Sequence, residues 1–135
     1  RPKIEEAVKA SGLEEYIILK GQQSDVRPFY HASDLFTLTS ESVETFSIAA
    51  LEAMSCGLPA VLTDIGGARE MVKDGLNGFI CDTSPEDIAA KWAKALGAGL
   101  SGHDISLYIR EHFDLKQMTT AYEQIMGISL SAFPE

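Results

Sequence analysis

The sequence predicts an α/β protein whose parallel sheet is covered by helices on both faces. Short apolar runs of about four residues alternate with longer segments of helical periodicity, which is the pattern of buried parallel strands joined by crossover helices. A polar or glycine-containing turn follows each apolar run. The chain has 135 residues, 45% of them hydrophobic and 23% charged, which is enough for one domain with its own core.

The first part of the chain is expected to hold two helices with a strand between them. Residues 2–11 carry apolar side chains at helical spacing, and Gly12 stops that helix. Residues 16–19 (YIIL) form a short apolar run that predicts a buried strand. Residues 24–32 predict a helix that starts with capping Ser and Asp residues and tolerates a proline in its first turn.

The middle of the chain alternates between strands and helices. Residues 35–38 and 60–63 are the next two apolar runs and predict strands, with an almost wholly apolar helix between them. Gly66-Gly67 opens a shorter helix that runs to about Lys73. Residues 78–81 predict the fourth strand.

The last part of the chain is expected to be helical. Residues 85–96, 105–112 and 115–126 each place apolar side chains at helical spacing. Asp114 is expected to cap the last of these helices.

The rest of the chain is organised around residues 41–59, where a short polar loop runs into the apolar helix. The loop ends in Glu44 and Thr45, and the helix carries a second carboxylate, Glu52. With a helix start near Phe46, the two glutamates would lie about 80° apart around the axis and about 12 Å apart along it. The free N–H groups and positive dipole end of a helix mouth suit phosphate oxygens.

Spacing alone leaves two interpretations of the glutamate pair open. Glu44 could merely favour the helix dipole while Glu52 lies on a solvated surface. The apolar neighbours of Glu52 favour a binding role, because a buried carboxylate is costly without a partner. A ligand hydroxyl or an arginine could be that partner.

Polar and glycine-rich residues follow the predicted strands, at the edge where open α/β sheets bind ligands. They are Lys20-Gly21, the stretch from Thr39 to Glu44, the stretch from Asp64 to Gly67, and Cys81-Asp82. This placement predicts a site for a small, phosphorylated molecule and does not by itself indicate a reaction.

Composition limits the classes of partner. A net charge of −9 with no basic cluster argues against a nucleic-acid or anionic-membrane surface. Cys56 and Cys81 do not form a disulfide framework, and we expect both to be small buried residues in a reducing compartment. No apolar run is long enough for a membrane span, and no signal-peptide pattern is present. Because the chain begins with Arg1 rather than Met, we expect it to be a piece of a longer protein. We expect that protein to be cytoplasmic.

Several motifs together resemble the donor-binding half of retaining glycosyltransferases with the GT-B architecture. This large family includes relatives of glycogen and sucrose synthases. The resemblance covers roughly residues 1–126, which we take as one Rossmann-like domain followed by a tail at residues 127–135. The motifs are the two glutamates separated by seven residues, Leu51-Glu52-Ala53-Met54, Gly57 with Pro59, Gly66-Gly67 with Glu70, Asn77-Gly78, and the segments Leu19-Lys20-Gly21 and Ala32-Ser33-Asp34-Leu35-Phe36.

The resemblance implies that a nucleotide-diphosphate sugar, such as a UDP-sugar, is the donor substrate and that no cofactor or metal is needed. Glu44 would lie by the donor sugar and act in catalysis, and Glu52 would hold the ribose hydroxyls. Thr45, Phe46, Ser47 and Ile48 would bind the sugar and diphosphate, partly through backbone N–H groups. Gly66 and Gly67 are further donor-binding candidates, and Gly21 would border the base.

The chain also departs from the family pattern. Thr45 stands where glycine or proline is frequent, and Ser47 stands where glycine is frequent, so its Cβ could narrow the approach to the ligand. The family's basic diphosphate-binding pair and its acceptor-binding domain would both precede residue 1. The acceptor, a carbohydrate or a lipid-linked molecule, would bind through that domain, which could also bring the enzyme to a membrane surface.

Other classes of function compete with this interpretation. The runner-up is a non-catalytic α/β ligand-binding or regulatory module that keeps the fold and has lost the chemistry. A phosphorylase or a sugar-nucleotide epimerase of similar architecture is a third option, although the Leu51–Met54 context of the glutamates argues against the epimerase.

In the resembling family the sheet has the strand order 3-2-1-4-5-6, which predicts where residues 16–19 lie in it. Residues 16–19 would be the third strand, and the two strands between it and residues 35–38 would precede residue 1. With those two strands absent, residues 16–19 could close directly onto residues 35–38, a second molecule could fill the gap, or the first helix and strand could pack loosely. We expect direct closure, since consecutive strands often neighbour one another.

Overall fold

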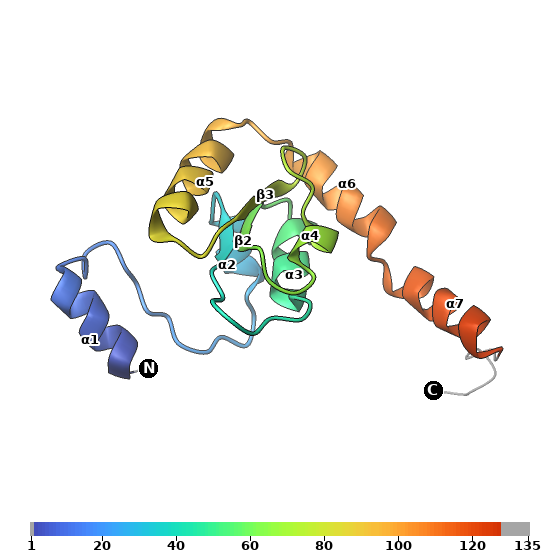
Figure 1. Cartoon of the computed structure of the whole chain (residues 1–135), viewed down its shortest axis with the longest axis horizontal. Coiled ribbons are helices and arrows are strands. Elements are labelled where there is room, and N and C mark those ends of the chain that lie inside the picture. Colours follow the sequence, from blue (N-terminus) through green and yellow to red (C-terminus); the bar gives the residue numbers. More distant parts are fainter. Residues whose placement is uncertain (1, 128–135) are drawn as a thin grey trace.

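A computed structural model describes residues 2–127 of the chain. Three parallel strands form one sheet in the order β1-β2-β3 (Figure 1). They are β1 (Phe36–Leu38), β2 (Ala60–Thr63) and β3 (Gly78–Cys81). Phe36 lies opposite Ala60, and Ala60 lies opposite Gly78. Three of the four predicted strands are therefore confirmed to within one residue, and the sheet is parallel as predicted.

Seven helices lie within the described residues, close to the predicted positions. They are α1 (Pro2–Ser11), α2 (Arg27–His31), α3 (Ile48–Ser55), α4 (Ala68–Met71), α5 (Pro85–Gly97), α6 (Gly102–His112) and α7 (Leu115–Met126). The side chain of Asp114 makes no capping hydrogen bond, although this residue occupies the N-cap position of α7. Of the predicted tail at residues 127–135, all but Gly127 lies outside the described residues.

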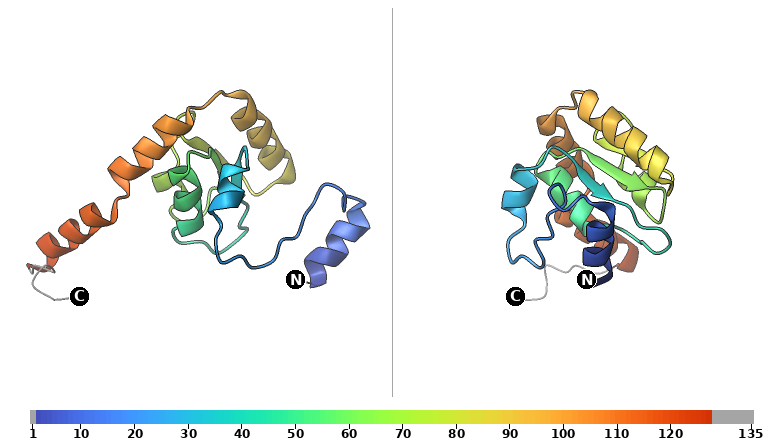
Figure 2. Two further views of the ribbon diagram at one scale, coloured as in Figure 1. Left: turned by 180° about the vertical axis from the view of Figure 1, so that it is seen from behind. Right: turned by 90° about the vertical axis from the view of Figure 1, so that its left-hand side faces the viewer.

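The helices cover both faces of the sheet, as the sequence predicts. Side chains of a strand alternate between its faces, so Ala60 and Leu62 join the core under α3, α4 and α6. Val61 points to the other face and packs in a smaller core that includes Ala95 of α5. Figure 2 shows α3 and α5 on opposite sides of the strands. This two-sided burial confirms the α/β, Rossmann-like arrangement.

Helix α6 is fixed firmly against α3. Ile105 is fully buried at their interface, and the Ser106 hydroxyl donates a 2.9 Å hydrogen bond to the carbonyl oxygen of Ser55. Gly57, just after α3, lies so close to Gly102 that a Cβ on Gly57 would sit 2.9 Å from the Gly102 carbonyl oxygen. Two glycines thus allow the backbones to approach, and the end of α3 packs directly against the start of α6.

The predicted strand at residues 16–19 is wrong. These residues form no strand, and their side chains are exposed, with Tyr16 at 80% and Ile18 at 70%. The backbone amides of Tyr16 and Ile17 bond only to the carbonyl oxygen of Leu13. Closure of this segment onto β1 is therefore also wrong. The physical reason is that a strand depends on its ladder partners, and among residues 2–127 β1 pairs only with β2.

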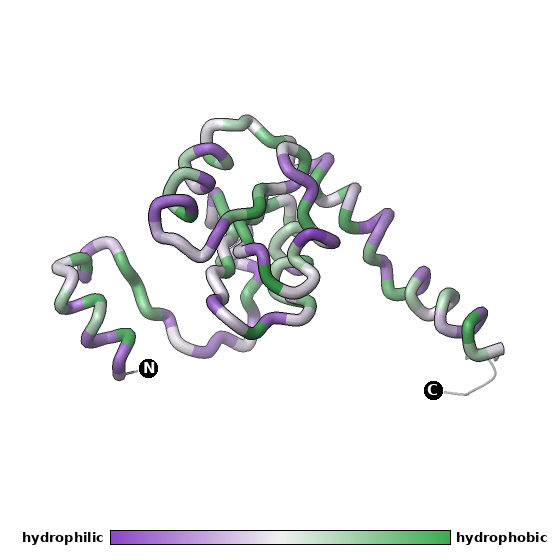
Figure 3. The backbone as a smooth tube through the Cα atoms, in the orientation of Figure 1, coloured by the Kyte–Doolittle hydropathy of each residue, from purple (hydrophilic) through white to green (hydrophobic). Residues whose placement is uncertain are grey.

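Helices α1 and α7 extend from the body on opposite sides (Figures 1 and 2). An exposed segment that includes a hydrophobic stretch connects α1 to α2 (Figure 3). The apolar stripe of α7 is also exposed: Leu115 at 69%, Met118 at 52%, Tyr122 at 56%, Ile125 at 84% and Met126 at 62%. No helix within the described residues is both long and apolar enough to cross a membrane.

Candidate functional site

The mouth of α3 presents free amide donors. Ser47 is the N-cap, and its Oγ accepts a 3.2 Å hydrogen bond from the amide of Ala50. Ile48 and Ala49 are exposed residues, and their backbone amides form no hydrogen bond within residues 2–127. The first amides of a helix lack intrahelical partners and lie at its positive dipole end. This end of α3 is therefore suited to an anionic group.

Ser47 uses its side chain to cap the first turn of α3. Its side chain is buried, at 6% exposure, and turns toward the helix to cap Ala50. The hydroxyl thus satisfies one amide of the first turn. A glycine could not make this bond, so the serine stabilises the start of α3.

Glu44 lies in the loop before α3 rather than within its first turn. It is half-buried, and its Oε1 accepts a 3.1 Å hydrogen bond from the amide of Thr45. A small cavity beside it is also lined by Ser40 and Thr63, which lie at the ends of β1 and β2. Because α3 begins only at Ile48, the predicted helical separation of the two glutamates, about 80° and 12 Å, does not apply.

The Gly66-Gly67 turn packs directly against the loop that carries Glu44. The Gly67 amide donates a 2.6 Å hydrogen bond to the carbonyl oxygen of Thr45. A Cβ at Gly66 would lie 2.8 Å from that same oxygen and closer still to the Glu44 carbonyl oxygen. The sequence-predicted site residues that the structure brings together here are Glu44, Thr45, Phe46, Ser47, Ile48, Gly66 and Gly67.

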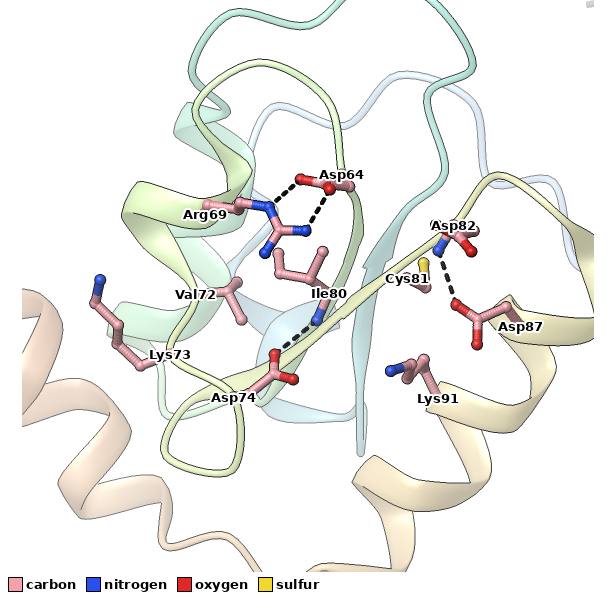
Figure 4. A pocket seen from close by; sticks show the side chains of 10 residues that line it. All are labelled: Asp64, Arg69, Val72, Lys73, Asp74, Ile80, Cys81, Asp82, Asp87 and Lys91. Carbon is pink, nitrogen blue, oxygen red and sulfur yellow. Dashed lines mark hydrogen bonds and ion pairs between the residues drawn. The ribbon is translucent and has the colours of Figure 1, made fainter.

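An ion pair braces this glycine turn. The Nε and Nη2 atoms of Arg69 donate hydrogen bonds of 2.7 and 2.5 Å to the two carboxylate oxygens of Asp64 (Figure 4). The guanidinium lowers the pKa of the Asp64 carboxyl below its usual range. The sequence allows Asp64 either to cap or to brace the turn, and the structure gives it the bracing role.

A polar cavity of about 770 Å³ opens beside the same ion pair, between α4 and the start of α5 (Figure 4). Two further acids of this cavity have structural partners: Asp74 Oδ1 accepts from the amide of Ile80 at 3.0 Å, and Asp87 Oδ2 accepts from the amide of Asp82 at 2.8 Å. Within residues 2–127, no three His, Cys, Asp or Glu side chains gather in a way that could hold a metal ion.

Glu52 is exposed, so the prediction that it is buried among apolar neighbours is wrong. Helix α3 buries one stripe, Ala50, Ala53 and Met54. At ~100° per residue, Glu52 lies roughly opposite that stripe. The Tyr30 hydroxyl lies 3.4 Å from Glu52 Oε2, and burial together with the Glu52 charge raises the pKa of Tyr30. Both residues line an open cavity of about 520 Å³ between α2 and α3.

Gly21 remains separate from the residues around the α3 mouth. It is exposed in the segment between α1 and α2. No hydrogen bond within the described residues links Gly21 to the α3 mouth. Its predicted place beside a base stays a prediction.

Sequence reasoning missed one contact of this site. The Phe46 ring packs on the ring of Phe113, with centroids 5.9 Å apart and planes tilted by 48°. The two rings share the wall of an apolar cavity of about 660 Å³ with residues of α3 and α7. No local pattern could reveal this contact, because it joins distant parts of the chain.

Comparison with known proteins gives a consistent family. The family model described as glycosyl transferases group 1 matches residues 1–112. The D-inositol 3-phosphate glycosyltransferase of Corynebacterium urealyticum is 35% identical over 115 residues, which is 83% of this chain and 26% of that protein. The chain spans about a quarter or less of the length of the curated relatives it matches.

Solved structures share the fold. Sucrose-phosphate synthase from Thermosynechococcus elongatus superimposes with a TM-score of 0.81 at 23% identity, covering 95% of this chain and 35% of that one. HepE from Anabaena, crystallised in complex with UDP, superimposes with a TM-score of 0.80 at 24% identity, covering 93% of this chain and 36% of its own.

Proposed function

Because the chain belongs to the glycosyl transferases group 1 family, we propose that it is the donor-binding portion of an enzyme that transfers a sugar from a nucleotide-diphosphate sugar to an acceptor. Its fold is that of the C-terminal half of a GT-B glycosyltransferase. Transfer proceeds with retention of anomeric configuration. The acceptor, a carbohydrate or a lipid-linked molecule, binds to a part of the enzyme outside this chain, and the enzyme acts in the cytoplasm or at its membrane surface.

The observation that carries this proposal is the mouth of α3 with its unbonded amides of Ile48 and Ala49. A diphosphate is an anion with several acceptor oxygens, and it gains charge as the glycosyl bond breaks. The helix dipole and the two amides stabilise that developing charge. HepE, which has the same fold, was crystallised with UDP, and this supports a uridine diphosphate sugar as the donor.

Glu44 and Glu52 take different parts in this proposal. Glu44 lies at the carboxyl ends of β1 and β2, where its negative charge stabilises the positive charge that develops on the sugar. Glu52 lies on the exposed side of α3, where its carboxylate accepts hydrogen bonds from the ribose hydroxyls. We name residues 44–47 the donor loop, because they connect the sugar position to the diphosphate position.

The first test is donor binding by the full-length enzyme. Titration calorimetry with a series of nucleoside-diphosphate sugars should give saturable binding of at least one UDP-sugar. The non-catalytic module would bind a donor without transferring its sugar. Failure of every donor in the series to bind would contradict the proposal.

Replacing Glu52 by alanine should weaken nucleotide binding and leave the fold intact. Loss of a charged hydrogen-bond partner is expected to cost roughly 1.5–3 kcal/mol of binding free energy, and the exposure of Glu52 makes unfolding unexpected. Calorimetry with UDP measures the effect. Glu86→Ala, which removes an exposed carboxylate from α5, is the control. Unchanged affinity in a folded Glu52→Ala variant would return Glu52 to a simple surface role.

The isolated 135-residue chain should not transfer sugar, whatever nucleotide it binds. The proposed acceptor domain and basic diphosphate contacts lie outside it, and closure of two domains normally excludes water from such sites. A radiolabelled UDP-sugar and a panel of carbohydrate acceptors measure transfer. Product formation by the purified chain would contradict its description as a donor-binding portion only.

A further inference from the structure

The ring of Phe46 is held from two sides. On one side it lies against the glycine turn, so closely that a Cβ at Gly67 would sit 2.7 Å from Phe46 Cδ2. On the other side it meets Phe113 in the tilted contact described above. Phe46 follows Glu44 by two residues and directly precedes the N-cap of α3. The position of this ring therefore affects both ends of the donor loop.

Phe113 is itself fixed by the end of α6. It is the C-cap residue of that helix, and its amide donates a 2.9 Å hydrogen bond to the carbonyl oxygen of Ile109. Ile109 is 4% exposed and belongs to the main core. The Phe113 ring also lies edge-on to Tyr108, with centroids 6.3 Å apart. The ring of Phe113 is thus presented by a helix that is fixed to α3.

Phe46 is the residue of the donor loop whose side chain contacts the end of α6, through Phe113. Thr45 is exposed, and the buried side chain of Ser47 is used for capping. Phe46, at 38% exposure, is the large apolar side chain of the loop. On the side away from the glycine turn, Phe46 lines the apolar cavity that Phe113 and residues of α7 also line.

We propose that Phe113 is a positioning residue for sugar transfer: its ring holds Phe46, and through Phe46 it holds the donor loop in register with the Gly66-Gly67 turn. This inference rests on the proposed function, because it assigns the held loop to donor binding. When the donor loop shifts from the turn, its groups no longer match the position of the donor, and the donor is held less well. An aromatic pair between two rings of this separation supplies a directional contact that an aliphatic residue does not reproduce.

The test combines amide hydrogen exchange with donor kinetics. The Gly67 amide, bonded to the Thr45 carbonyl oxygen, reports directly on contact between the loop and the turn. Exchange is measured by NMR on the 135-residue chain, relative to the core amide of Leu62. Steady-state kinetics with a UDP-sugar are measured on the full-length enzyme. The variants are Phe113→Ala and the conservative Phe113→Tyr, and Phe79→Leu perturbs the core on the opposite face of the sheet.

We expect Phe113→Ala to accelerate exchange at Gly67 about 10-fold more than at Leu62. In the full-length enzyme, donor KM should rise about 5-fold, with a smaller change in kcat. Phe113→Tyr should restore both values to within about twofold, because it keeps the ring. Phe79→Leu should change Gly67 and Leu62 exchange equally.

Equal changes at Gly67 and Leu62 in Phe113→Ala would overturn the inference and reduce Phe113 to a packing residue. The inference also fails if Phe113→Tyr does not restore donor KM, or if Phe79→Leu reproduces the Gly67 effect. The exchange measurement needs no substrate. It therefore tests whether Phe113 holds the donor loop against the turn even if the full-length enzyme binds no nucleotide sugar. Absence of nucleotide-sugar binding would contradict the proposed function and not the contact.

Discussion

Replacing Glu44 by glutamine in the full-length enzyme is expected to lower kcat about 100-fold, with a smaller effect on donor affinity. The charge of Glu44 matters most as the glycosyl bond breaks, and an interaction that strengthens only in the transition state affects turnover more than binding. Losing one preorganised electrostatic group typically costs about 10²–10³ in kcat. Steady-state kinetics with saturating donor, together with calorimetry for affinity, separates the two effects.

Glutamine is the appropriate replacement because it keeps the shape of a half-buried side chain. Its amide oxygen can still accept the hydrogen bond that the Thr45 amide gives to Glu44. Glu41→Gln, an exposed acid at the start of the same loop, is the matched control and should retain wild-type turnover. Comparable losses of kcat and affinity in Glu44→Gln remain compatible with the proposed role. A kcat equal to that of the wild type would remove Glu44 from the mechanism.

Substitution of Gly66 in the glycine turn should also have a large effect, in this case on the stability of the fold. We expect Gly66→Ala to reduce the free energy of unfolding by roughly 2–5 kcal/mol. Gly66 has φ +59°, where an L residue costs ~1–2 kcal/mol. Its new Cβ would also collide with the carbonyl groups of Glu44 and Thr45, and overpacking costs another ~1–3 kcal/mol. Because relief requires the donor loop to move, donor affinity should fall as well.

Gly75→Ala separates the two contributions to this effect. Gly75 also has a positive φ, +80°, but a Cβ there would meet nothing within 4 Å. The control should therefore lose only the backbone cost of ~1–2 kcal/mol and keep wild-type donor affinity. Urea unfolding of both variants gives the two free energies. If both glycines cost the same, the packing of the turn against the donor loop has no energetic role.

Much of the sheet could be predicted because its strands are short, apolar and clearly bounded. Strand β2 is fully buried on both faces, with Pro59 before it and Asp64 after it. Residues 16–19 have the same local character but form no strand. Their apolar composition specifies that they can be buried, whereas a strand forms only where a neighbouring strand accepts its hydrogen bonds. The composition of a segment shows that it can be buried but does not show whether a neighbouring strand is present.

Part of the site could also be predicted from the positions of the strands. The donor loop and the glycine turn are recognisable in the sequence as the polar ends of β1 and β2, because a parallel sheet brings such ends together. The exposure of Glu52 was missed because α3 is apolar on nearly all sides, so its pattern does not show which stripe faces the core. Phe113 was missed because its contact with Phe46 depends on how α6 docks on α3.

The two edges of the sheet, as formed by residues 2–127, differ in whether they can take up a further strand. Along the outer edge of β3, the carbonyl oxygen of Gly78 accepts a 3.0 Å bond from the amide of Gly75, and the amide of Ile80 is bonded to Asp74 Oδ1. That edge is already occupied by its own loop. The far side of β1 has no strand partner within residues 2–127.

A sheet with two free edges can add neighbours on both sides and grow into a fibre. Within residues 2–127, the β3 side is occupied by its own loop and the far side of β1 is not paired with a strand, so further strands of the longer protein can be added beside β1 and not beside β3. The loop around Asp74 therefore closes the sheet on the β3 side.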